Sequence, residues 1–180
     1  MADPVAIPAP QRYDNTTIWL HWLSAALVLV LWLLGENIDW FSRGDPRVIA
    51  RSTHIALGTV LASLLVWRIV WRLTRGRRLP AAELGRWHMA STLVHFALYA
   101  LIVCAVVLGI ANVWVRGDNI FNLFTVPAFD PQNRALRGRV EELHETFANA
   151  LLILALLHAA AGAWHYWRRD GVLARMGVGR

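Results

Sequence analysis

The stretch His144-Glu-Thr-Phe-Ala-Asn-Ala-Leu-Leu-Ile-Leu-Ala-Leu-Leu-His158 decides the fold of this chain. Its apolar run predicts one long helix over about residues 140–167. The two histidines are fourteen residues apart. That is almost four helical turns, so both imidazoles project from nearly the same face, roughly 21 Å apart along the axis. This separation is most of the thickness of a bilayer, so one helix presents a ligand-capable side chain near each membrane surface.

The composition indicates a membrane protein. Hydrophobic residues make up 57% of the 180 residues and charged residues 17%, which is too apolar for an ordinary soluble domain of this size. Four apolar stretches each have about the twenty residues that a helix needs to cross the hydrocarbon core. They cover about residues 17–38, 52–73, 89–114 and 143–167. We therefore predict an all-α, integral membrane, up-down four-helix bundle as a single domain over residues 14–176, between a disordered tail, 1–13, and a short tail, 177–180.

Arginine placement predicts the orientation, because all 18 basic residues are arginines. With both termini and the connection 74–86 on one side, that side has a net charge of +7 and the opposite side −1. Basic residues concentrate on the cytoplasmic side, so both termini are expected there and no nucleic-acid partner is needed to explain the charge. The first apolar stretch has no basic segment before it, so we do not expect a cleaved signal sequence. Asp14 or Asn15 is expected to cap its helix.

Four histidines fall at two matched depths. His21 lies near the cytoplasmic end of the first stretch and His158 in the cytoplasmic half of the fourth, while His54 and His144 lie at the opposite, periplasmic ends of their stretches. A histidine within a spanning segment is costly and is a functional candidate by default. Any one of them could serve as an interhelical hydrogen-bonding group. Four at two matched depths favour two bis-histidine sites.

The ligand chemistry of these sites favours haem. Zinc sites gather three or four nitrogen, sulfur or carboxylate ligands, and each depth offers only two good histidines. Two facing imidazoles suit the axial positions of a haem iron, whose other four ligands come from the porphyrin. The single cysteine, Cys104, and the absence of a C-x-x-C-H motif exclude a covalently attached haem and a cysteine-rich cluster.

The three remaining histidines are weaker candidates. His165 lies on the same face as His158 and could compete with it as the partner of His21, although its interfacial surroundings favour a solvated or propionate-bonding role. His95 has no axial partner left, and could bond a haem propionate, a quinone carbonyl or a neighbouring helix. His88 is expected at the membrane interface.

Arg68 and Arg72 are the candidate anchors for haem propionates. They are four residues apart at the cytoplasmic end of the second stretch, so they share a helical face. Guanidinium groups bind carboxylates well. Extension of both side chains to the lipid headgroups is the alternative, and it explains Arg72 better than the deeper Arg68.

Short motifs around the histidines are typical of a known family. They are Leu20-His-Trp22, Thr53-His-Ile-Ala-Leu-Gly58, His144-Glu145, Leu157-His-Ala-Ala-Ala161 and Arg169-Asp-Gly-Val-Leu-Ala-Arg-Met176. Together they resemble the prokaryotic cytochrome b561 family over residues 13–176. The resemblance implies a four-helix bundle of the bacterial inner membrane that binds two b-type haems and exchanges electrons with the quinone pool. It implies that His21 and His158 ligate the cytoplasmic-side haem b and His54 and His144 the periplasmic-side one, and it disfavours His165.

The resemblance also suggests an activity. The short length and the loop Arg116-Gly-Asp-Asn-Ile-Phe-Asn-Leu-Phe124 resemble the superoxide oxidase type, which passes electrons from periplasmic superoxide to ubiquinone. The alternatives are a cytochrome b anchor subunit serving a dehydrogenase or hydrogenase, and a helical membrane protein without redox chemistry. Lipid and quinone are expected partners, and both a monomer and a homo-oligomer remain open. An anionic donor requires a locally positive entrance among the periplasmic arginines, which are Arg43, Arg47, Arg51, Arg116, Arg134, Arg137 and Arg139.

Overall fold

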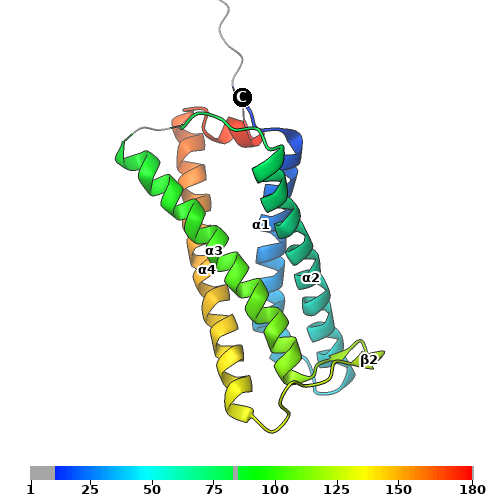
Figure 1. The fold of residues 1–180 in the computed structure, drawn as a ribbon. Helices are drawn as coiled ribbons and strands as arrows, with labels where there is room; N and C mark the ends of the chain where they lie inside the picture. The colour runs from blue at the N-terminus through cyan, green and yellow to red at the C-terminus, as the bar shows by residue number, and fades with distance from the viewer. Residues whose placement is uncertain (1–10, 83–84, 180) are drawn as a thin grey trace, which may run out of the picture.

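The computed structural model describes residues 11–82 and 85–179 and contains four long antiparallel helices (Figure 1). Within these residues, four helices are long and apolar enough to cross a membrane. They are α1 (Asn15–Asn37), α2 (Asp45–Thr74), α3 (Arg86–Arg116) and α4 (Arg134–Arg168). The predicted membrane four-helix bundle is confirmed. Most of the tail predicted to be disordered, residues 1–10, and the last residue of the C-terminal tail lie outside the described residues.

Helices α1 and α4 begin before their apolar stretches because polar side chains cap their first turns. The Asp14 carboxylate accepts a hydrogen bond from the backbone N–H of Thr17 at 2.8 Å, which confirms the expected cap of α1. The largest difference is at α4, which starts at Arg134 because the Asn133 side chain accepts a hydrogen bond from the backbone N–H of Leu136. Hydropathy alone does not detect such polar first turns.

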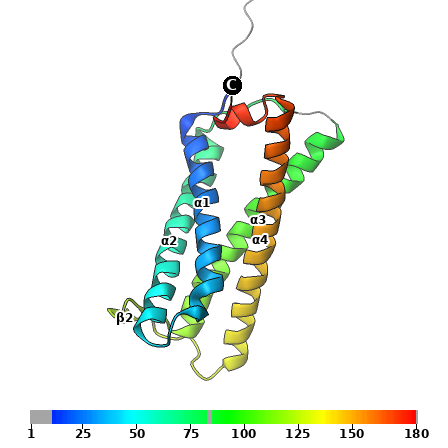
Figure 2. The ribbon, with the colours of Figure 1, turned by 180° about the vertical axis from the view of Figure 1, so that it is seen from behind.

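The two ends of the bundle differ in what they hold. The described residues before α1, those after α4 and those that follow α2 lie at one end, which we call the terminal end; the α1–α2 and α3–α4 connections lie at the other, the hairpin end (Figures 1 and 2). Helix α1 packs mainly along α2, and α3 mainly along α4. Helix α3 starts apart from α1 and α2 at the terminal end and approaches them toward the hairpin end (Figures 1 and 2).

A buried apolar layer crosses the middle of the bundle. All four helices contribute to it, and Leu151 lies midway between His144 and His158 on α4. The outer faces expose many large apolar side chains, as expected for a lipid-facing surface. This central apolar layer consists of Leu31, Leu61, Leu65, Ile102 and Leu151.

Hydrogen bonds to one carboxylate join α1 to α2 at the terminal end. Asp14 also accepts hydrogen bonds from the Trp71 indole N–H at 2.9 Å and from the Arg77 backbone N–H at 3.0 Å. Partial burial raises the pKa of Asp14, but the hydrogen bonds from Thr17, Arg77 and Trp71 lower it more, so the pKa is well below the ordinary value of 3.8. The ionised carboxylate therefore stabilises this end.

The C-terminal segment folds back across the terminal end. The short helix η2 (Leu173–Met176) follows α4. The Trp22 indole N–H donates to the Met176 carbonyl at 3.1 Å, and the Tyr13 backbone N–H donates to the Arg175 carbonyl at 3.0 Å. Tyr13 is therefore ordered, although the tail was predicted to be disordered through this residue.

A small hairpin closes the opposite end. Strands β1 (Asn119–Ile120) and β2 (Phe124–Thr125) pair antiparallel between α3 and α4. The fully buried Ser52 hydroxyl donates to the Asn119 carbonyl at 3.2 Å and accepts from the Phe121 backbone N–H at 2.8 Å. These bonds fix the hairpin to α2 two residues before His54.

Candidate functional site

The structure brings four of the predicted histidines together as two pairs. His21 of α1 lies against His158 of α4, with ring centres 6.2 Å apart and ring planes at 79°. His54 of α2 lies against His144 of α4, with centres 6.2 Å apart and planes at 84°. We call them the terminal-end pair and the hairpin-end pair. They lie on opposite sides of the central apolar layer, so the bundle holds two similar sites at two depths.

The spacing of both pairs fits a six-coordinate haem iron. Bonds between a metal and an imidazole nitrogen are about 2.0–2.1 Å, and that nitrogen lies about 1.1 Å from its ring centre, so two axial imidazoles have centres about 6.3 Å apart. The observed 6.2 Å agrees with this value at both depths. The porphyrin supplies the remaining four ligands, so two histidines complete the coordination. The residues present therefore fit a haem at each pair.

Backbone carbonyls support the hairpin-end pair. The Nδ1 of His144 donates to the Ala105 carbonyl of α3 at 2.9 Å. A proton on Nδ1 leaves Nε2 with its lone pair, which is the form that ligates a metal. The buried Nδ1 of His54 lies near the Leu31 carbonyl of α1 but makes no hydrogen bond in the described structure.

Side chains surround the terminal-end pair. The Arg68 guanidinium donates to Nδ1 of His21 at 3.1 Å and lies over the Tyr99 ring, 5.2 Å from its centre. The His95 ring meets the His158 ring edge-on, with centres 5.1 Å apart. An Nδ1 that accepts a hydrogen bond cannot also carry the proton of a neutral ligand bound through Nε2. Arg68 would therefore leave this nitrogen when a metal binds His21.

Three other candidates lie away from the pairs. Arg72 donates to the Arg77 carbonyl at 3.1 Å and belongs to the network of the terminal end. His165 is bonded to the Asp170 carboxylate, with Nδ1 and Oδ2 2.7 Å apart. His88 is exposed in the first turn of α3. Of the four residues proposed for propionate or quinone contacts, the structure brings only Arg68 and His95 to a histidine pair.

Asp118 marks a charged cluster at the hairpin end. The residue is 8% exposed, and its carboxylate lies 3.8 Å from Arg51 and 3.5 Å from Arg116. Burial raises the pKa of Asp118 above its ordinary value, against the lowering effect of the two arginines. Arg116 also pairs with Glu141. Two of the seven arginines expected on this side, Arg51 and Arg116, therefore lie together around one carboxylate. They belong to two different helices, and their spacing in the sequence does not indicate that they meet.

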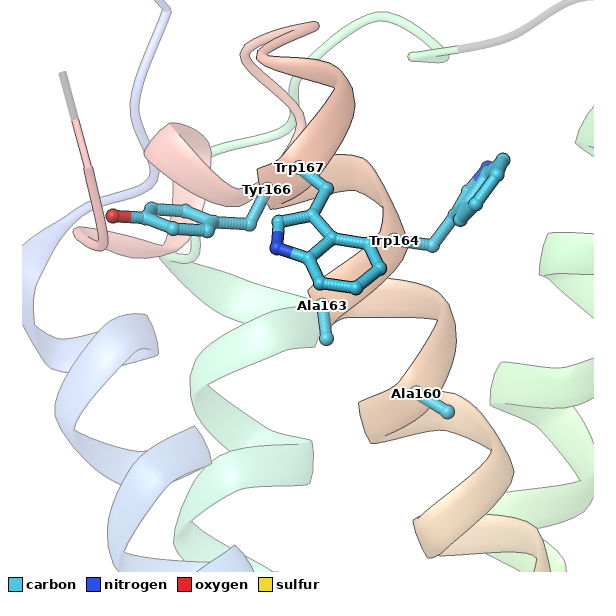
Figure 3. A pocket seen from close by; sticks show the side chains of 5 residues that line it. All are labelled: Ala160, Ala163, Trp164, Tyr166 and Trp167. Atoms are coloured by element: carbon cyan, nitrogen blue, oxygen red, sulfur yellow. The ribbon is translucent and has the colours of Figure 1, made fainter.

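An apolar hollow on the outer face of α4 is not part of either pair. It has a volume of about 370 Å³ near the terminal end. In Figure 3, Trp164 and Tyr166 point to opposite sides, with Trp167 over Ala163. Its lining belongs to one helix and contains no charged residue, so it is part of the aromatic membrane interface. The lining residues are Ala160, Ala163, Trp164, Tyr166 and Trp167.

Comparison with known proteins identifies the family. Residues 12–179 match the sequence model of the family described as prokaryotic cytochrome b561. The chain belongs to the prokaryotic cytochrome b561 family. It is therefore a multi-pass membrane haem protein, and haem b is the cofactor that its family implies. The resemblance inferred from the short motifs is confirmed.

The curated relatives of this b561-family protein match over almost their whole length. Cytochrome b561 homolog 1 of Escherichia coli (strain K12) is 28% identical over 169 residues, which cover 92% of this chain and 96% of the relative. Probable superoxide oxidase CybB of Yersinia pestis is 26% identical over 178 residues, or 92% and 96% of the two chains. Cytochrome b562 of Cereibacter sphaeroides is 26% identical over 170 residues, or 91% and 94%. The family thus includes oxidoreductase-type electron-transfer proteins.

Proposed function

We propose that this b561-family protein takes single electrons from superoxide at its hairpin end and delivers them to ubiquinone. The observation that carries the proposal is the pair of histidine sites, which have the same 6.2 Å ring spacing at two depths of one bundle. The arginine charge favours a cytoplasmic terminal end and a periplasmic hairpin end. The similarity to a probable superoxide oxidase supports superoxide as the donor.

The four paired histidines are the proposed axial ligands. His21 and His158 would hold haem b at the terminal end, and His54 and His144 would hold haem b at the hairpin end. Haem b bound at the two pairs supplies a one-electron couple at each depth. The central apolar layer excludes water from the space between them.

Two side chains have proposed roles beside the terminal-end pair. Arg68, once released from His21, is placed to bind a haem propionate through a charge-assisted hydrogen bond. His95 lies against His158 and is the proposed contact for a quinone carbonyl. Its Nδ1 donates to the Ser91 carbonyl at 2.6 Å, which holds the ring in one orientation, so the contact with a quinone carbonyl requires a second proton on Nε2.

The hairpin end provides the proposed entrance for the anion. Arg51 and Arg116 carry two positive charges there, which the carboxylates of Asp118 and Glu141 balance. Arg51 also lies one helical turn before His54 on the same face of α2. Arg51 is therefore the group proposed to bind superoxide through a charge-assisted hydrogen bond, since the cluster as a whole has no net charge. Each superoxide loses one electron to become dioxygen, and two electrons with two protons convert ubiquinone to ubiquinol.

Rapid mixing of the haem-loaded protein with superoxide tests the proposal. We expect fast reduction of the haem absorption bands, reoxidation on addition of ubiquinone, and loss of both responses when superoxide dismutase is added first. The reduction rate should depend little on ionic strength, because the charges of Arg51 and Arg116 are balanced by Asp118 and Glu141. No fast reduction, or no quinone-dependent reoxidation, would refute this function. A stable co-purifying dehydrogenase or hydrogenase with little activity of the isolated chain would support an anchor subunit instead.

A further inference from the structure

We propose that Gly35 and Gly109 are positioning residues that fix the two imidazoles of the hairpin-end pair. Each glycine, with the carbonyl of the residue four positions before it, forms what we call a glycine seat. The two seats are Leu31 with Gly35 on α1, and Ala105 with Gly109 on α3. The inference rests on the proposed role of His54 and His144 as haem ligands.

The seat on α3 holds the ring of His144. A Cβ atom added to Gly109 would lie 3.1 Å from Cε1 and 3.5 Å from Nδ1 of His144. The ring therefore occupies the place where a side chain at residue 109 would begin. The same Nδ1 donates to the Ala105 carbonyl at 2.9 Å. The ring thus contacts both parts of the seat.

The seat on α1 has the same arrangement and lies against the ring of His54. A Cβ atom added to Gly35 would lie 3.3 Å from Cε1 and 3.7 Å from Nδ1 of His54. This Nδ1 approaches the Leu31 carbonyl, one turn before Gly35. A small rotation of the ring would complete the hydrogen bond that the Ala105 seat already has, and would satisfy the buried Nδ1.

Helix geometry explains why the residue must be glycine. A helical side chain leans toward the N-terminus and covers the turn before its own Cα. A side chain at position i+4 therefore covers the outer side of the carbonyl at position i. Glycine leaves that carbonyl open to a ring from a neighbouring helix. Glycine is unfavourable inside a helix, and at Gly35 and Gly109 the ring packed against the Cβ position accounts for its presence.

The two seats restrict the orientation of the two rings. The Cε1 edge of each imidazole lies against one seat, Nδ1 of His144 is also hydrogen-bonded there, and the ring planes of the pair lie at 84°. Crossed axial imidazoles give a low-spin ferric haem a strongly anisotropic electron paramagnetic resonance signal, whereas parallel rings give a less anisotropic one. None of the described glycines has a Cβ position in contact with His21 or His158. A change in the seats should therefore alter one haem and spare the other.

Alanine substitutions at the two glycines test the inference. For Gly109→Ala and Gly35→Ala we expect the ferric signal and the midpoint potential of the hairpin-end haem to shift, with partial loss of that haem, while the terminal-end haem is unchanged. The larger effect should come from Gly109→Ala, where the contact is tighter. The matched control is Gly138→Ala on α4, because a Cβ there meets no atom within 4 Å. Alanine favours helix formation, so a general effect on folding would act in the opposite direction.

The terminal-end haem serves as the internal control for correct folding of each variant. Unchanged signals and potentials of both haems in Gly35→Ala and Gly109→Ala would overturn the inference, and so would the joint loss of both haems in either variant. A parent protein without haem, or a His144→Ala variant that keeps its full haem content, would instead refute the proposed ligands. The two failures are therefore distinguishable.

Discussion

The two histidine pairs have the same ring spacing but different support. Main-chain carbonyls of α1 and α3 lie behind the hairpin-end rings, whereas Arg68 and His95 surround the terminal-end rings. Backbone groups are positioned by the packing of whole helices and cannot rotate away. Long side chains can rearrange when a ligand enters. The rings at the hairpin end are thus held in place before a cofactor binds. The side chains around the rings at the terminal end rearrange when a cofactor binds.

The path of α3 also differs between the two ends. It lies close to the other helices at the hairpin end and apart from α1 and α2 at the terminal end (Figures 1 and 2). Only where helices approach closely can a carbonyl of one reach a ring on another. At the terminal end, the side chains of Arg68 and His95 reach the histidines instead.

Removal of one ligand from each pair gives the largest expected effect. His144→Ala should remove the hairpin-end haem and His158→Ala the terminal-end haem, because an iron that loses an axial imidazole is held weakly in an apolar bundle. Haem content by the pyridine haemochrome assay and a redox titration measure the loss. Each variant should retain one midpoint potential of the parent. Loss of both haems from His144→Ala would show that the pairs are not independent.

Arg68 is the next test, because it belongs to one pair only. Arg68→Ala should lower the midpoint potential of the terminal-end haem by an amount on the order of tens of millivolts, since a nearby positive charge favours the reduced form. The hairpin-end potential should not change. Arg72→Ala is the control, because Arg72 bonds the Arg77 carbonyl rather than the pair. Equal shifts in both variants would contradict a specific role of Arg68.

The sequence predicted the bundle and brought the right histidines to the same depth, because hydropathy and spacing along one helix are local properties. It distinguished Arg68 from Arg72 only by depth, since both lie on one face of α2, and the contact of Arg68 with His21 depends on the packing of α1. The glycine seats depend on which helix faces each ring. The Asp118 cluster joins residues far apart in the chain, so no local pattern indicates it.

Ser52 tests whether the hairpin contributes to the organisation of its end. Ser52→Ala removes two hydrogen bonds and leaves the Phe121 N–H and the Asn119 carbonyl without this partner. We expect a loss of roughly 2 kcal/mol in the free energy of unfolding. Thermal unfolding in detergent measures it, and the hairpin-end haem should dissociate at a lower temperature than the terminal-end haem. Simultaneous loss of the two haems at the parent temperature would contradict this.

Asp14 gives the smallest expected effect, at the opposite end. Asp14→Ala should lower the free energy of unfolding by about 1 kcal/mol, as expected for a lost helix cap. Because the pKa of folded Asp14 lies below the ordinary value of 3.8, its stabilisation is complete above that pH and is lost as the pH falls. The difference between parent and variant, measured by unfolding at several pH values, should therefore narrow below about pH 4. A constant difference would show that the ionised form is not required.

The central apolar layer has a consequence for bioenergetics. Under the proposed orientation, an electron that passes from the hairpin-end pair to the terminal-end pair crosses roughly 21 Å of the about 30 Å hydrocarbon core without a compensating ion. A membrane potential that is negative inside opposes this movement by about 2.3 kcal/mol per 100 mV for a full crossing, and by about two thirds of that for this distance. Turnover in sealed vesicles should therefore be electrogenic and should accelerate when an ionophore collapses the voltage.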